Sequence, residues 1–175
     1  MSKFPVVSLC ALLGVLGFSS VQAASDGVIN FDGEIIAGGC DVAPGSDAQT
    51  VNMGIMSVKS FKGAGSTVGS AQFNIELANC HPSLTSVGLV FDGISSADDD
   101  AILALQGANS AQGVGIALYE IDGTTLIPLR MQGRANILNG ESGTTLRYVA
   151  KYKATSETVT AGKASAVVNF TLVYN

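Results

Sequence analysis

The sequence predicts an all-β protein, and three observations support this class. Short runs rich in Val, Ile, Leu and aromatic residues recur along the chain, separated by Gly, Asn, Asp and Ser. A helical repeat of apolar residues is almost absent after the first 23 residues. Many short strands at this spacing are typical of a β-sandwich, and a length of 175 residues suits a single domain.

The first element, residues 1–23, is predicted to be a secretory signal peptide. Lys3 supplies the positive charge, residues 6–18 are apolar, and Val21 and Ala23 are small residues before a cleavage site. An N-terminal membrane helix is the alternative, but glycines and serines interrupt the run, which is short for a span. Loss of Lys3 on cleavage changes the net charge from −5 to −6. Such an acidic chain does not suit nucleic acid or an anionic membrane as a partner.

The second element, residues 24–36, is predicted to be an extended segment ahead of the domain at residues 37–175. Side chains of an extended chain alternate with period two, so Gly27, Ile29, Phe31 and Gly33 share one face. Residues 28–36 of this segment also form an apolar run that predicts a strand, and a simpler interpretation makes this run the first strand of a complete sandwich. The protein would then be a self-contained secreted binding module.

The domain itself shows eight further runs that predict strands. These are residues 50–53, 73–77, 87–91, 102–105, 114–121, 126–129, 144–154 and 167–174. Asp122 and Gly123 predict a hairpin turn between residues 114–121 and 125–129. Residues 58–69 form the longest predicted loop.

The last run has an unusual position for so apolar a strand. Val168, Phe170, Leu172 and Tyr174 share one face, and the sequence stops one residue later at Asn175. No hairpin partner follows, so something else must cover this edge and this face. A final strand without cover and a spare strand at the start suit a chain that joins copies of itself end to end.

Two cysteines remain after the predicted cleavage, Cys40 and Cys80. An even number of cysteines in an exported protein indicates a disulfide. The two residues are 40 positions apart, so closing this loop should stabilise the fold by roughly 3–4 kcal/mol. The alternatives are two free thiols or a metal pair, but with a single histidine a structural zinc site could be completed only with carboxylates.

The sequence offers little that could carry catalysis. His81, the one histidine, lies between Cys80 and Pro82, where a turn is expected. Asp98, Asp99 and Asp100 could attract calcium, but the spaced ligands and the glycine of a calcium loop are missing. One histidine also excludes a superoxide dismutase-like metal site. We therefore expect no enzyme activity, no metal and no cofactor.

The end of the chain combines an alternating last strand with a penultimate tyrosine (Tyr174) and a glycine fourteenth from the end (Gly162). Six further segments precede them in order, namely residues 31–40, 49–54, 73–80, 87–93, 113–118 and 146–154. Taken together and in this order, these features resemble the structural subunits of chaperone–usher pili, in particular type 1 and P fimbrial pilins of Gram-negative bacteria. The resemblance covers essentially the whole chain.

This resemblance implies an incomplete immunoglobulin-like sandwich that lacks its final strand. A groove beside the last strand would be lined by Val168, Phe170, Leu172 and Tyr174. A periplasmic chaperone would first fill the groove and hold the terminal carboxylate of Asn175 in its basic cleft. At the outer-membrane usher, residues 24–36 of the next subunit would then replace the chaperone strand, as in other strand-addition complexes.

The expected product is therefore a surface fimbrium that supports cell adhesion. Its subunits would be exported through the periplasm and joined by donor strands. Gly27, Ile29, Phe31 and Gly33 would face the groove of the neighbour, and the partners would be neighbouring pilus subunits, the chaperone and the usher.

Overall fold

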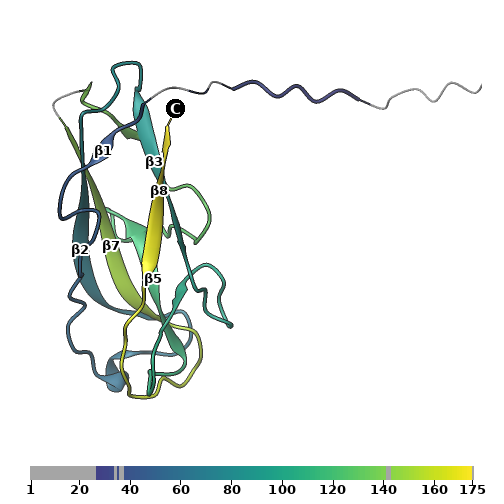
Figure 1. The fold of residues 1–175 in the computed structure, drawn as a ribbon. Helices are drawn as coiled ribbons and strands as arrows, with labels where there is room; N and C mark the ends of the chain where they lie inside the picture. Colours follow the sequence, from purple (N-terminus) through teal and green to yellow (C-terminus); the bar gives the residue numbers. More distant parts are fainter. Residues whose placement is uncertain (1–26, 34, 36–37, 141–142, 175) are drawn as a thin grey trace, which may run out of the picture. The chain divides into compact units, whose positions relative to one another are not determined.

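The computed structural model describes residues 27–33, 35, 38–140 and 143–174 (Figure 1). The chain divides into two units, Met1–Ile35 and Ile36–Asn175, and the predicted signal peptide lies outside the described residues. In the first unit, residues 27–33 and 35 belong to no helix or strand, so the strand predicted at 28–36 is absent among them. An extended segment becomes a strand only when its backbone finds a hydrogen-bonded partner.

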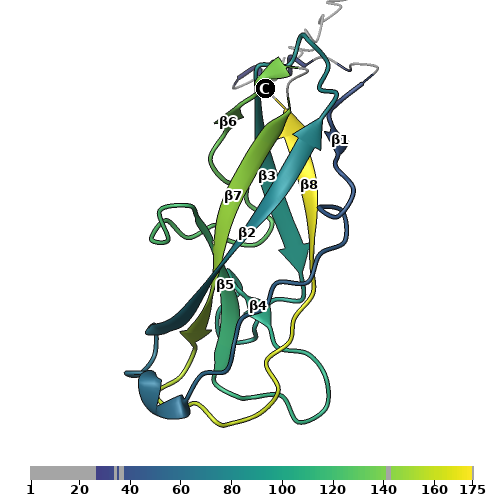
Figure 2. The ribbon, with the colours of Figure 1, turned by 90° about the vertical axis from the view of Figure 1, so that its left-hand side faces the viewer.

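The second unit consists of two antiparallel sheets (Figures 1 and 2). One has the strand order β1-β2-β7-β5-β4, and the other has the order β6-β3-β8. The strands are β1 (Asp41–Val42), β2 (Thr67–Ala78), β3 (Ser86–Gly93), β4 (Leu103–Ala104), β5 (Val114–Glu120), β6 (Asn136–Ile137), β7 (Thr144–Ala154) and β8 (Val168–Tyr174). The described residues contain one short 3-10 helix, η1 (Val58–Ser60), and no α-helix. The predicted all-β class is confirmed.

The strands with the longest apolar alternation form the centre of the fold. Strand β7 has the bounds that the sequence predicts, and it pairs with β2 on one side and β5 on the other. All seven residues of β5 are buried, as expected for a strand covered on both faces. Strand β2 is longer than predicted, and β8 begins one residue later than predicted.

The core between the sheets contains a cluster of aromatic rings. Phe91 and Tyr148 are almost completely buried and meet edge to face, with ring centroids 5.3 Å apart. Phe73 lies 5.7 Å from the Tyr148 ring and 6.2 Å from the Phe91 ring. Such ring pairs add about 0.5–1.5 kcal/mol beyond the burial of area. They join β2 and β7 in one sheet to β3 in the other.

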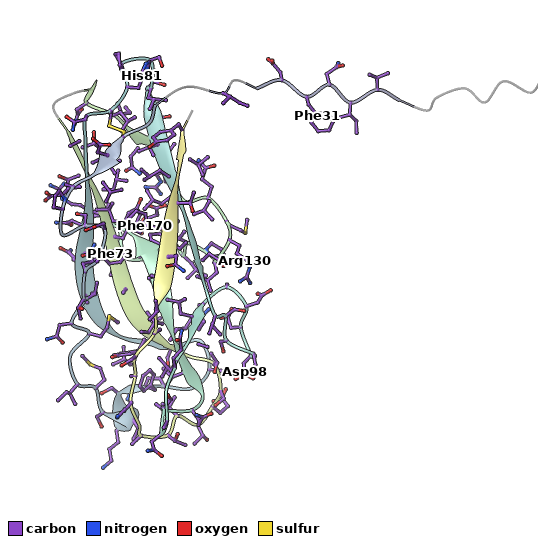
Figure 3. All side chains as sticks on the ribbon, in the orientation of Figure 1. Phe31, Phe73, His81, Asp98, Arg130 and Phe170 are labelled. Atoms are coloured by element: carbon purple, nitrogen blue, oxygen red, sulfur yellow. A yellow bond between two sulfur atoms is a disulfide. The ribbon has the colours of Figure 1, made fainter. Side chains whose placement is uncertain are left out.

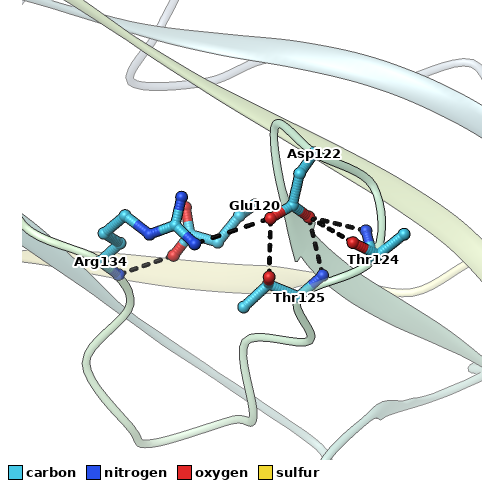
Figure 4. Close-up of polar contacts among 5 residues, drawn as sticks. All are labelled: Glu120, Asp122, Thr124, Thr125 and Arg134. Carbon is cyan, nitrogen blue, oxygen red and sulfur yellow. Dashed lines mark hydrogen bonds and ion pairs between the residues drawn. The ribbon is translucent and has the colours of Figure 1, made fainter.

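The predicted turn at Asp122 and Gly123 is confirmed (Figure 4). The backbone N–H of Glu120 donates to the Thr125 carbonyl, and that of Ile127 donates to the Leu118 carbonyl. The Asp122 carboxylate accepts hydrogen bonds from the backbone N–H and the hydroxyl of Thr124 and of Thr125, and these lower its pKa. The turn is therefore fixed by its own side chains.

Three other predictions about local structure are wrong. Residues 50–53 form no strand, and residues 126–129 make only one β-bridge, between Tyr119 and Leu126. The predicted loop at residues 58–69 contains η1, and β2 begins within it at Thr67. Residues 50–53 alternate in burial as a strand would, but they have no ladder partner. Alternation predicts which side chains face inward and leaves open whether a neighbouring strand exists.

Candidate functional site

An apolar groove of about 1260 Å³ lies within the second unit. Residues 46–58 form one border, and residues 159–170 form the other. Its floor is made of core side chains from both sheets, which include Phe73, Ile75, Phe91, Leu103, Ile116, Leu118 and Tyr152. Asp47 is the one charged residue among the described residues that line it. The hydrophobic core is thus open along one side.

The first border follows the edge of β2 without forming a ladder. The Ala43 N–H donates to the Glu76 carbonyl at 2.8 Å, and the Glu76 N–H donates to the Ser46 hydroxyl at 3.0 Å. Further along, the Gln49 side-chain amide donates to the Asn74 carbonyl at 2.8 Å. These bonds are too few to make residues 46–58 a strand. They hold the segment beside β2 and leave its other side facing the groove.

The second border is the approach to β8 and its first residues. Ala164, Ala166, Val168 and Phe170 are half-buried and pack against the core on one face, and the residues between them are exposed. Figure 3 shows Phe170 on β8 and Phe73 on β2, two of the residues that line the groove. Strand β8 pairs with β3 along its whole length and has no second ladder among the described residues.

An edge of this kind has a specific chemical requirement. Backbone N–H and C=O groups on the open side of β8 need partners, and the apolar side chains beside them need cover. An exposed apolar surface next to a strand edge is an aggregation hazard in a protein that stays a monomer. The arrangement suits one occupant above others, which is an extended peptide with apolar side chains at alternate positions.

Of the four residues that the sequence predicts at the groove, two line it and two do not. Val168 and Phe170 line it, whereas Leu172 and Tyr174 do not line it and pack against the core beyond its end. The Tyr174 hydroxyl accepts a hydrogen bond of 2.8 Å from the Cys40 N–H. Asn175 lies outside the described residues.

The predicted disulfide between Cys40 and Cys80 is present. It joins the residue before β1 to the turn after β2, and Cys80 is buried. Gly39 lies directly against the Tyr174 ring, because a Cβ added there would be 2.7 Å from the hydroxyl oxygen. The start of the second unit is therefore fastened to the end of β8 at this point.

Gly162 lies where the second border meets the loop before β5. The Ala111 N–H donates to the Lys163 carbonyl, and the Lys163 N–H donates to the Asn109 carbonyl, each at 2.9 Å. A Cβ added to Gly162 would overlap the Ala111 nitrogen, and it would be 2.6 Å from the Ser110 carbonyl carbon. Gly162 therefore allows two backbone segments to approach more closely than any side chain would permit.

Replacing Gly162 by alanine should destabilise the second unit by about 1–3 kcal/mol, because an extra methyl group in a packed site forces the backbone apart. Urea unfolding would measure this free energy. Gly38→Ala is the matched control, since the nearest atom to a Cβ there is 3.8 Å away. Equal unfolding midpoints for the two variants would contradict the close approach at Gly162.

The predicted donor residues lie in the first unit, where they are exposed. Ile29 and Phe31 expose 80% and 95% of their surface, and Ile35, on the same period-two face, is fully exposed. Figure 3 shows Phe31 on the extended segment. Gly27 and Gly33 have no atom within 4 Å of an added Cβ. Exposed apolar side chains at alternate positions are costly in water, so this segment has surface available for a partner.

Sequence reasoning missed most of the first border. It predicted residues 50–53 as a strand, but it did not place them or residues 54–58 at the groove. A signal for the second border did exist, because Ala164 and Ala166 continue the period-two pattern of Val168 and Phe170 toward the N-terminus. These alanines are small, so that part of the border leaves room for larger side chains of an occupant.

The histidine and the paired aspartate of the acidic run Asp98–Asp100 have structural roles, in a turn and in an ion pair. The His81 N–H donates to the Gly39 carbonyl, and its ring contacts the Ser83 hydroxyl at 2.7 Å, so it occupies the expected turn. Asp99 pairs with Lys153 at 2.8 Å, which lowers the pKa of the Asp99 carboxyl.

No metal-binding group of three or more His, Cys, Asp or Glu side chains occurs among the described residues. No helix in the described part of the chain is long and apolar enough to cross a membrane.

Comparisons with known proteins agree with one another. The family model described as "Fimbrial protein" matches residues 29–175. Long polar fimbria protein A of Salmonella typhimurium is 35% identical over 172 residues, which cover 97% of this chain and 96% of that protein. The crystal structure of the P pilus rod subunit PapA matches 79% of this chain and all of its own chain, at 25% identity and a TM-score of 0.65. A structure of a chaperone–usher pilus matches 90% of this chain and all of its own, with the same identity and TM-score.

Proposed function

Because the chain belongs to the fimbrial protein family and is a structural subunit of a surface pilus, we propose that residues 24–36 of one copy fill the groove of the next. The observation that supports this proposal most directly is the open groove beside β8. The inserted segment would supply the strand that the sandwich lacks. It would give β8 a second ladder and cover the core at Phe73 and Phe91.

The donor face consists of Gly27, Ile29, Phe31 and Gly33. Moving Ile29 and Phe31 from water into the groove contributes roughly 1.5–3 kcal/mol each. Backbone hydrogen bonds to β8 add to this, because they satisfy groups on the edge where β8 has no ladder among the described residues. The two glycines let the donor backbone approach the border closely.

We assign the acceptor to both borders of the groove. Val168 and Phe170 line it, and Leu172 and Tyr174 continue the same face toward the C-terminus. The family resemblance adds two further partners before assembly. A periplasmic chaperone would hold the groove and the carboxylate of Asn175, and an outer-membrane usher would exchange the chaperone for the next subunit.

The direction of the donor gives a reason for this exchange to proceed without ATP. In the family, the chaperone strand runs parallel to the last strand of the subunit and the donor strand runs antiparallel to it. Antiparallel ladders are slightly more stable per residue. Export through the periplasm would begin with the signal peptide at residues 1–23, and the finished polymer would lie on the cell surface and support adhesion.

The test is whether a separate peptide of residues 24–36 can supply the strand that completes the sandwich. Refolded residues 37–175 are unfolded by heat with and without a synthetic peptide of residues 24–36, and a peptide carrying aspartate at positions 29 and 31 is the control. We expect a 1:1 complex and a large rise in melting temperature with the native peptide alone. A stable domain that ignores both peptides would mean a closed sandwich, as expected for a self-contained secreted binding module.

A further inference from the structure

Three lysines lie next in sequence to residues that line the groove. Lys59 follows Val58, Lys62 follows Phe61, and Lys163 lies between Gly162 and Ala164; those four neighbours all line the groove. All three lysines are exposed. None of them makes an ion pair among the described residues, whereas Arg130, Arg134 and Lys153 each pair with an aspartate.

Buried and exposed residues alternate along the second border, and this alternation shows which way the Lys163 side chain points. Ala164, Ala166, Val168 and Phe170 face the core, so the exposed residues at odd positions from Lys163 to Thr171 face outward. Backbone bridges pair Lys163 with Ser110 and Ser165 with Gln106 on one side of this segment. A strand inserted on its other side would therefore bring its own outward residues next to Lys163.

The donor segment carries the opposite charge. Residues 24–36 contain Asp26, Asp32 and Glu34 and no lysine or arginine. Asp32 and Glu34 alternate with Phe31 and Gly33, so they lie on the face that points away from the groove. The mature chain is acidic as a whole, so two copies repel one another except where a local basic surface meets an acidic segment.

The sizes of the side chains on the donor segment and on the second border favour one register of the inserted strand. In an antiparallel ladder with Ile29 opposite Ala166 and Phe31 opposite Ala164, the two large donor residues meet the two small border residues. Gly27 then lies opposite Val168, and residues 24–36 span residues 171–159, which nearly coincide with the border segment 159–170. The same register places Asp32 directly opposite Lys163, where cross-strand charge pairs interact.

We propose that Lys163, supported by Lys59 and Lys62 next to the first border, recognises Asp32 of the incoming donor strand, and so guides it into the groove and fixes its register. This inference rests on the proposed function, since the occupant is the donor segment of a second copy. The opposite direction of insertion would carry Asp32 toward Asp47, the charged residue on the first border. Charge therefore favours the antiparallel strand.

The experiment measures the rate at which the refolded mature chain, residues 24–175, polymerises at low ionic strength. The variants are Lys163→Glu, Asp32→Lys and the two changes combined. We expect each single change to slow assembly about tenfold, since opposite charges accelerate encounter and like charges suppress it. The double variant restores the attraction and should recover most of the rate. In 0.5 M NaCl the differences should shrink, because the Debye length is then only a few ångströms.

Arg147→Glu is the matched control, because Arg147 is an exposed cation on β7 that does not line the groove and makes no ion pair among the described residues. It should leave the polymerisation rate unchanged. Asp32→Lys changes an exposed residue of the first unit, so its effect does not depend on the folding of the groove. A double variant as slow as the single variants, or a control as slow as Lys163→Glu, would overturn the pairing and leave donor-strand assembly in place. A parent chain that forms no polymer would overturn both.

Discussion

Replacing Ile29 and Phe31 together by aspartate should abolish polymer formation and leave the folded domain intact. Both side chains are largely exposed, so the change removes little packing among the described residues. In the groove, the same change loses roughly 1.5–3 kcal/mol of burial at each position and adds two carboxylates that would have to leave water. The lost burial alone weakens the contact by a factor on the order of 10² to 10⁴.

Size-exclusion chromatography of the mature chain measures this effect directly. Val28→Asp is the matched control, because Val28 is 83% exposed and lies on the opposite face of the same segment. The control should still polymerise, and both variants should unfold at the same temperature when kept as monomers. Polymers of normal length from the double variant would show that another surface joins the subunits.

Replacing Cys40 and Cys80 by alanine should have the largest effect on the free energy of unfolding. The disulfide closes a loop of 40 positions, so its loss should cost roughly 3–4 kcal/mol. The position of Cys40 adds a local effect, because its N–H donates to the Tyr174 hydroxyl and the next residues form β1. Release of this end would loosen the border of the groove together with the end of β8.

Guanidinium unfolding of the variant and of the native chain gives this free energy. The native chain, reduced under denaturing conditions and refolded with its thiols blocked, is an independent control for loss of the bond without a change of sequence. Both should unfold at much lower denaturant concentration than the oxidised chain. An unchanged midpoint would mean that β1 and Tyr174 hold this end without the covalent link.

Much of the domain could be predicted from apolar alternation. Strand β7 was predicted with its exact bounds and β8 within one residue, since long alternating runs have few other stable structures. The disulfide followed from an even number of cysteines, and the turn at Asp122 followed from the Asp-Gly pair. These features depend on residues that are close in sequence, or, for the disulfide, on the number of cysteines alone.

The site was less predictable, because it depends on a strand partner that β8 does not find among the described residues. Residues 46–58 alternate only weakly, and their place at the groove follows from hydrogen bonds to β2, such as that from Gln49 to Asn74. Leu172 and Tyr174 share a face with Phe170, yet the groove ends before them. Alternation predicts the inward face of a strand, but it does not predict how far along that face the cover is missing.

The link between Tyr174 and Cys40 has a mechanical consequence. In a fibre joined by donor strands as proposed above, a pulling force would enter each subunit along β8 and leave through the segment that precedes Cys40. The Tyr174 hydroxyl, the Cys40 N–H and the disulfide to Cys80 join these two points directly. Tension would therefore pass across one end of the sandwich, with a covalent bond in its path, and the aromatic core around Phe91 would carry little of the load.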